Sequence, residues 1–320
     1  MVKSDQRYQR LGIRYSKVFV FFAGFGCVAI LLALVIRQLL PASPFRTNIL
    51  LVGNPMLLAS YDTAKEHVAI VEIPAVTTIT GITGVGEYSL ESLWRLGKLD
   101  THNQNILPDS LSEALAVPVT WFVGPKGDAV PDQSEAEKVL RNVFSFSGLV
   151  QHVFTSRTTI PFGQYLMLVI ATTKLRPDAL SFINLHNTSA IITKDQADGT
   201  SVPMLDEARL DVVLGTTLQE DALRRESLRV AIFNTTRTPT LGRRLERHIN
   251  KVGALVVSVG NDVPAVDRCA LAGTALLLKS ITARYIQSIF GCEVKITDAN
   301  ARADLELRIG NVFERKFFPL

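Results

Sequence analysis

The fold of the last third of the chain follows from the stretch LRVAIFNTT, residues 228–236. Its side chains alternate in the period of two that is typical of a β-strand. A helix comes next, because Leu241, Leu245 and Ile249 recur along one helical face and Gly253 can end it. The stretch therefore predicts a strand that is followed at once by an amphipathic helix.

The rest of this region continues the alternation. We expect a strand, a second helix and two closing strands, at residues 255–259, 276–290, 294–296 and 305–309. The order β-α-β-α-β-β predicts a small α+β domain over residues 227–320, with both helices on one face of its sheet.

Residues 48–225 also alternate between apolar strand-like runs and amphipathic helices. We expect strands at residues 48–53, 68–73 and 119–123, and helices at residues 88–96, 107–115, 135–146 and 161–173. The runs at 180–185 and 189–193 are expected to pair with each other, and residues 206–223 favour no single element. This pattern predicts an α/β domain.

The N-terminal region contains a membrane-spanning pattern. Residues 18–36 include no charged side chain, and a helix over 18–40 is long enough to cross a bilayer. Residues 1–17 carry five basic side chains and one acid, so we expect them to be a cytoplasmic tail. After a linker at residues 41–47, which contains Pro41 and Pro44, the rest of the chain is then extracytoplasmic. A single-pass protein of the cell membrane, with the lipid bilayer as a partner, is the expected location.

The net charge of +4 comes from this tail. Residues 18–226 contain 15 basic and 21 acidic side chains, whereas residues 227–320 contain 14 basic and eight acidic ones. The two folded halves therefore have opposite charges. A nucleic acid is not an expected partner.

The C-terminal pattern resembles that of a known family. A strand ending in Asn-Thr, a helix opened by small residues, and a last strand like ADLELRIG at residues 303–310 are similar to the C-terminal domain of LytR-CpsA-Psr envelope proteins. This resemblance covers residues 228–312. Residues 48–225 look like a degenerate copy of the catalytic domain of that family, and the implied fold is an α/β ectodomain followed by the small α+β domain.

The resemblance implies an activity whose residues are missing here. Active members transfer lipid-pyrophosphate-linked glycopolymers to peptidoglycan, using arginines and aspartates that hold the pyrophosphate and Mg²⁺. In this chain Asn54 and Pro55 follow Gly53, and Ala75 follows Pro74, where such residues are expected. Because phosphoryl transfer needs cations that neutralise the developing charge, we expect no catalytic residue and no metal site. We also expect no cleft within residues 48–225 on which two or more arginines converge.

The helix that follows residue 240 has a basic face. Arg243, Arg247 and Lys251 lie at intervals of four, and Arg244 lies beside them. They form either a solvated surface or a site for an anionic wall polymer or a lipid headgroup.

Asn234 and Thr235 stand at the junction between the strand and this helix. They are suited to a turn or a helix cap, and alternatively to binding a polar ligand at the helix N-terminus.

Cys269 and Cys292 lie in the exported part, where disulfides persist. A straight helix between them would hold them roughly 22 Å apart, so a bridge requires residues 268–274 to be extended alongside the strand that begins at Cys292. We expect this disulfide, which closes a loop of roughly 24 residues and contributes about 3 kcal/mol. Two unpaired buried thiols are the alternative.

Three functions remain open at this stage. The first is a non-catalytic envelope protein that binds wall polymer or partner proteins, without a cofactor. The second is a divergent glycopolymer phosphotransferase, and the third is a regulator of transcription, for which a 17-residue tail is too short.

Overall fold

The computed structural model describes residues 45–82, 86–99, 104–127, 130–133, 135–197 and 199–317. The expected cytoplasmic tail, the membrane helix and most of the linker lie outside these ranges. Within them, no helix combines the length and the apolar character that crossing a bilayer requires.

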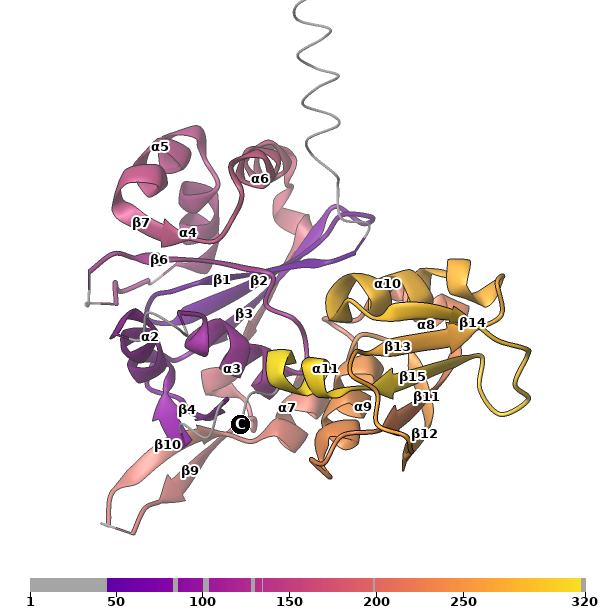
Figure 1. The fold of residues 1–320 in the computed structure, drawn as a ribbon. Helices are drawn as coiled ribbons and strands as arrows, with labels where there is room; N and C mark the ends of the chain where they lie inside the picture. The colour runs from indigo at the N-terminus through magenta and orange to yellow at the C-terminus, as the bar shows by residue number, and fades with distance from the viewer. Residues whose placement is uncertain are drawn as a thin grey trace, which may run out of the picture.

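A mixed sheet of six strands forms the centre of the first half (Figure 1). Its order is β7-β6-β1-β2-β3-β8. The strands are β1 (Thr47–Leu51), β2 (Met56–Asp62), β3 (His67–Ile73), β6 (Trp121–Pro125), β7 (Ser156–Thr158) and β8 (Leu180–Asn184). β1 pairs antiparallel with β2 and parallel with β6.

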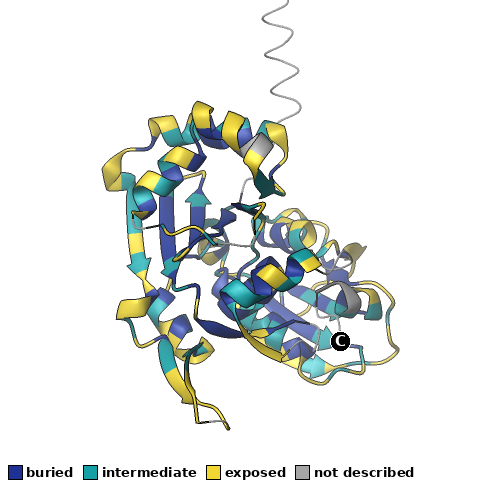
Figure 2. Ribbon diagram, turned by 90° about the vertical axis from the view of Figure 1, so that its left-hand side faces the viewer, coloured by how far each residue is buried: buried dark blue, intermediate teal, exposed yellow. Residues whose placement is uncertain are grey.

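Helices cover both faces of this sheet, which explains the continuous apolar runs of its strands. All five residues of β1 are buried. Leu50 and Leu58 face α2 (Leu90–Leu99) and α3 (Ile106–Leu115), whereas Ile49 and Leu57 face the other layer. That layer consists of α4 (Ala136–Val143), α5 (Phe146–Thr155) and α6 (Phe162–Lys174). In Figure 2 the strands of the sheet are dark blue between these more exposed helices.

Some sequence predictions for this half are wrong. β2 was not expected, and it separates β1 from β3. The two runs at 180–185 and 189–193 do not pair with each other. Instead β8 extends the main sheet next to β3, while β9 (Ile191–Asp195) pairs with β10 (Ser201–Leu205). Local pattern shows that a run is a strand, but long-range packing decides its partner.

A second, smaller sheet lies at the edge of this half. Its order is β5-β4-β10-β9, with β4 at Thr78–Gly81 and β5 at Gly86–Ser89. Tyr88 therefore belongs to a strand, and the expected helix begins two residues later, at Leu90. The undecided stretch forms α7 (Glu207–Leu214), which Asp206 caps, and α8 (Asp221–Glu226).

The last third is a five-stranded sheet of order β12-β11-β15-β13-β14. Its elements are β11 (Arg229–Asn234), α9 (Leu241–Lys251), β12 (Leu255–Asn261), β13 (Ala270–Gly273), α10 (Ile281–Phe290), β14 (Glu293–Ile296), β15 (Leu305–Ile309) and α11 (Asn311–Phe317). Val230, Ile232 and Leu307 form one core with residues of both α9 and α10. The structure thus adds α11 to the expected order, whereas β13 is the extended segment that the predicted disulfide requires.

A disulfide joins Cys269 to Cys292, with their Cα atoms 4.5 Å apart. The second helix begins only at Ile281, because the Ser280 side chain caps it. Residues 270–273 are free to form β13, which runs parallel to β14 and brings the two cysteines together. This is the extended arrangement that the bridge requires.

The two halves share one hydrophobic core. Buried residues of α3 and of β11 belong to the same cluster, and Phe45 packs edge-on against Tyr285 of α10, with ring centroids 4.9 Å apart. Packing therefore fixes the position of the C-terminal third on the first half.

Candidate functional site

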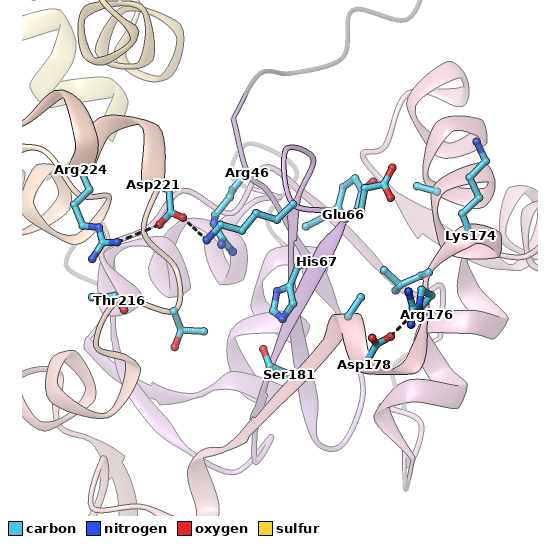
Figure 3. A pocket seen from close by; sticks show the side chains of 16 residues that line it. Arg46, Glu66, His67, Lys174, Arg176, Asp178, Ser181, Thr216, Asp221 and Arg224 are labelled. Atoms are coloured by element: carbon cyan, nitrogen blue, oxygen red, sulfur yellow. Dashed lines mark ion pairs between the residues drawn. The ribbon is translucent and has the colours of Figure 1, made fainter.

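A cleft of about 780 Å³ opens at one end of the main sheet. In Figure 3, Lys174 and Arg176 lie on one side, Asp221 and Arg224 on the other, and His67 between them. The cleft is lined by Arg46, Tyr61, Lys65, Glu66, His67, Ala171, Lys174, Leu175, Arg176, Asp178, Ala179, Ser181, Thr216, Thr217, Asp221 and Arg224. These residues come from the beginnings of three strands, the end of α6, and α8 with the turn before it.

The lining is cationic. Five Lys and Arg side chains face three carboxylates, which belong to Glu66, Asp178 and Asp221. Lys65 pairs with Asp221, and Arg176 with Asp178 at 3.1 Å. The side chains of Lys65 and Arg176 are nevertheless 51% and 80% exposed. Pairs this exposed are weak, so the cations remain accessible to an incoming anion.

Arg46 is held differently from the other cations. Its side chain is 6% exposed and donates from Nη2 to Asp62 Oδ2 at 2.9 Å. It also donates from Nε to the carbonyl of Gln219 at 2.9 Å and from Nη1 to Ser60 Oγ at 3.3 Å. Arg46 is therefore a fixed positive charge at the edge of the cleft.

Two titratable groups near Arg46, His67 and Glu220, have shifted pKa values. Burial, and then the Arg46 guanidinium, lowers the pKa of His67, so its ring is neutral near pH 7. Burial raises the pKa of Glu220 to about 7, although its carboxylate accepts a hydrogen bond from the backbone N–H of Arg46. Protonation of Glu220 consequently changes the charge behind the cleft near neutral pH.

Ser181 adds an unsatisfied polar atom to the cleft. It pairs in register with Ala69, so it lies on the same face of the sheet as His67. Its Oγ is buried and has no hydrogen-bond partner among the described residues.

The prediction that no cleft within residues 48–225 brings two arginines together is wrong. Arg176 and Arg224 both line this cleft, and Arg46 joins them from just outside that range. The sequence pattern missed them because Arg176 lies in a connection before β8 and Arg224 on a short helix. The two arginines line the cleft from opposite sides (Figure 3), and no sequence motif predicts that they share it.

In the structure, most of the basic side chains that the sequence predicts on α9 face carboxylates and carbonyls of the first half of the chain. Arg247 pairs with Asp211 at 2.7 Å and Glu207 at 2.8 Å, and it donates to the carbonyls of Glu113 and Ala114. All four partners belong to α3 and α7. The oppositely charged halves of the sequence thus meet at this interface.

The neighbours of Arg247 join the same interface. Arg244 pairs with Glu113 at 2.6 Å, and His248 lies 3.1 Å from the other oxygen of that carboxylate. Burial acts to raise the pKa of Glu113, but His248 and Arg244 outweigh it and hold that pKa below its usual value. Lys251 is buried and bonds the Asp211 carbonyl at 3.1 Å, whereas Arg243 stays exposed beside a shallow hollow.

Asn234 and Thr235 serve as turn-forming residues. Asn234 donates to the carbonyl of Thr238 at 2.8 Å and accepts the N–H of Thr236 at 3.0 Å. Thr235 Oγ1 donates to the carbonyl of Ile309 at 2.7 Å and accepts the N–H of Val266. Their polar atoms are used within the fold, so the geometry favours the turn interpretation.

The residues around the cleft do not suit Mg²⁺, which the family resemblance implies. Within the described ranges no group of three His, Cys, Asp or Glu side chains converges as a metal site. The Asp62 oxygens are bound by Arg46 and by the N–H groups of Ala64 and Lys65. Lys65 likewise occupies Asp221, so we derive no step through a metal ion.

Comparisons with known proteins match the fold of about half of the chain. No protein-family model matches the sequence, and no curated protein matches it. Among solved structures, "TagT bound to LI-WTA" has a TM-score of 0.40 and 14% identity, covering 54% of this chain and 90% of its own. The "LytR-CPS2A-psr family protein YwtF (TagT) with bound octaprenyl pyrophosphate lipid" has a TM-score of 0.39 with the same identity and coverage.

A third similar structure is the "transcriptional regulator yvhJ from Bacillus subtilis". It has a TM-score of 0.39 and 9% identity, and the match covers 54% of this chain and 94% of that one. At these levels the similarity does not assign a function. The proposal below rests on the cleft.

Proposed function

We propose that this chain is a membrane-anchored protein of the cell envelope that binds an anionic wall polymer, or its lipid-linked form, in the cleft at Arg46. The N-terminus is cytoplasmic and the folded part extracytoplasmic. One observation carries the proposal: four exposed cationic side chains, those of Lys65, Lys174, Arg176 and Arg224, line an open cleft of about 780 Å³. Repeating phosphates, with several oxygens each, suit such a set of Lys and Arg donors.

The arrangement favours binding over catalysis. Catalysis of phosphoryl transfer depends on donors that are fixed before the reaction begins. Arg176 and Arg224 are 80% and 58% exposed, and each has a carboxylate neighbour. Only Arg46 is rigidly held, and the residues do not suit a metal ion. The cleft can therefore hold an anion without being organised for turnover.

A divergent glycopolymer phosphotransferase is the second candidate. The observation in its favour is the presence of three arginines on one cleft, which the sequence did not predict. Release of a phosphorylated product from a synthetic lipid-linked pyrophosphate would support this candidate. Absence of turnover together with binding of the same compound would support the first one.

The binding test uses the full chain in lipid nanodiscs and poly(glycerol phosphate) as the probe. We expect the double variant Lys65→Ala/Arg176→Ala to bind the polymer about tenfold more weakly, because two accessible charges are lost. The control is Lys138→Ala/Arg209→Ala, which removes two exposed cations that do not line the cleft and should bind normally. Equal weakening in both variants would show nonspecific attraction and contradict the proposal.

Topology is tested separately. A reporter fused after Leu320 should be active only outside the cytoplasm, because the flanking charges orient the predicted span. Activity inside the cytoplasm would contradict the envelope location.

A further inference from the structure

Helices α5 and α6 expose an apolar surface that the cleft does not use. We propose that this surface, formed by Phe146, Val150, Phe162 and Ile170, lies in the headgroup region of the bilayer. The inference goes beyond polymer binding and rests on the membrane anchor of the proposed function. It concerns how the folded part sits on the membrane.

Helix α6 is apolar on both of its sides. Residues 162–173 contain no Lys, Arg, Asp or Glu. Tyr165, Leu168 and Val169 are buried against the main sheet, as expected for an inner face. The outer side carries Phe162, 66% exposed, and Ile170, 40% exposed. A surface helix of a soluble protein normally presents charges there, so this outer side lacks its ordinary solvent-facing residues.

Helix α5, which neighbours α6, carries a second pair of exposed apolar side chains. It too contains no Lys, Arg, Asp or Glu, and Phe146 and Val150 lie one helical turn apart at 61% exposure each. The two helices contact each other and occupy the upper end of the molecule in Figure 1. The helices at that end are largely yellow in Figure 2, which marks exposed residues. The four side chains thus belong to one end of the fold.

Charge at the border of this surface suits a lipid headgroup. α6 ends at Lys174, and Arg176 follows two residues later. Both side chains are exposed, as is Lys65 across the cleft. The acid nearest in sequence, Asp178, is paired with Arg176. Apolar side chains bordered by Lys and Arg are the pattern of segments that lie in the plane of a membrane surface.

The position of the first described residues favours a bilayer near the end of the molecule that carries α5 and α6. The last turn of α6 lines the same cleft as Arg46, which is the second described residue. The predicted membrane helix ends at residue 40, and five residues span at most roughly 17 Å when extended. The anchor therefore holds the membrane close to the cleft and to the end of α6. A lipid surface is the occupant that both the charges and this tether favour.

The test measures contact with lipid directly. The variant Phe162→Trp, in the full chain, is placed in nanodiscs whose lipids carry bromine near the headgroup. We expect roughly half or more of its added fluorescence to be quenched, because the indole would lie among the lipids. Wild-type protein supplies the background of Trp94 and Trp121, and Val150→Trp provides a second position on the same surface.

The matched control is Val212→Trp. Val212 is 82% exposed and lies on α7, which is in the lower part of the molecule in Figure 1, away from α5 and α6. We expect little quenching there. Equal quenching at all three positions would overturn the proposal. Absence of quenching at Phe162 and Val150 would also overturn it, and would mean that the surface faces water or a protein partner. No polymer is present, so the result does not depend on whether the cleft binds one.

Discussion

Two basic regions of this protein differ in how far their cations are paired within the fold. The cations of the cleft are mostly exposed and weakly paired. Most cations of α9 are paired with carboxylates and carbonyls of the first half. The Arg247 side chain by itself contacts four residues there, Glu113, Ala114, Glu207 and Asp211. Periodic Lys and Arg residues on a helix therefore indicate a charged face. Whether that face is available depends on what packs against it.

Among the single substitutions, Arg247→Ala should have the largest effect on stability. Unchanged stability of this variant would show that the cations of α9 do not hold the interface. The side chain is 21% exposed, and its removal takes a shared cation from Glu207 and Asp211, although Asp211 keeps its ion pair with Lys251 at 3.3 Å. We expect the free energy of unfolding to fall by about 2–3 kcal/mol, because the carbonyls of Glu113 and Ala114 also lose their donor. Urea unfolding of the full chain in detergent measures it.

Arg243→Ala is the matched control on the same helix. Arg243 is exposed and makes no ion pair with a described residue, so we expect a change within about 0.5 kcal/mol. Similar losses in both variants would mean that the interface does not distinguish the two arginines.

Glu220→Gln should have an intermediate and pH-dependent effect. The folded state keeps the Glu220 proton up to a pKa of about 7, whereas the unfolded chain releases it near its ordinary pKa of 4.5. Since the folded state then binds more protons, wild-type stability falls as the pH rises through this window. The variant should lack that loss, on the order of 2 kcal/mol. Parallel stability profiles of the two proteins between pH 4.5 and 7.5 would refute the assignment.

Lys65→Ala should have the smallest effect on stability. The side chain is 51% exposed and pairs only across the cleft with Asp221. We expect a change within about 0.5 kcal/mol, together with weaker binding of poly(glycerol phosphate). A loss of stability as large as that of Arg247→Ala would make the cleft cations structural and remove the contrast between the two regions.

The cleft itself could not be predicted from the sequence. Arg46, Arg176 and Arg224 are far apart in the sequence, and they line one cleft only in the folded chain. An unexpected strand, β2, lies between β1 and β3 and sets their spacing. Strand partners are fixed by packing over long sequence separations, which short-range periodicity does not record.

The sequence by itself determined those helices and strands that follow from the periodic spacing of nearby apolar residues. The stripe of Leu241, Leu245 and Ile249 specified α9, and the apolar runs specified β1, β3 and β11, because a helix or strand must bury its apolar face. Only the tertiary structure decided which surfaces stay available. It covered the basic face of α9 with the acidic first half, held Arg46 against Asp62, and left the other cations of the cleft exposed. These outcomes depend on contacts between residues far apart in the chain, and burial decides whether a charge pairs within the protein or remains free for a ligand.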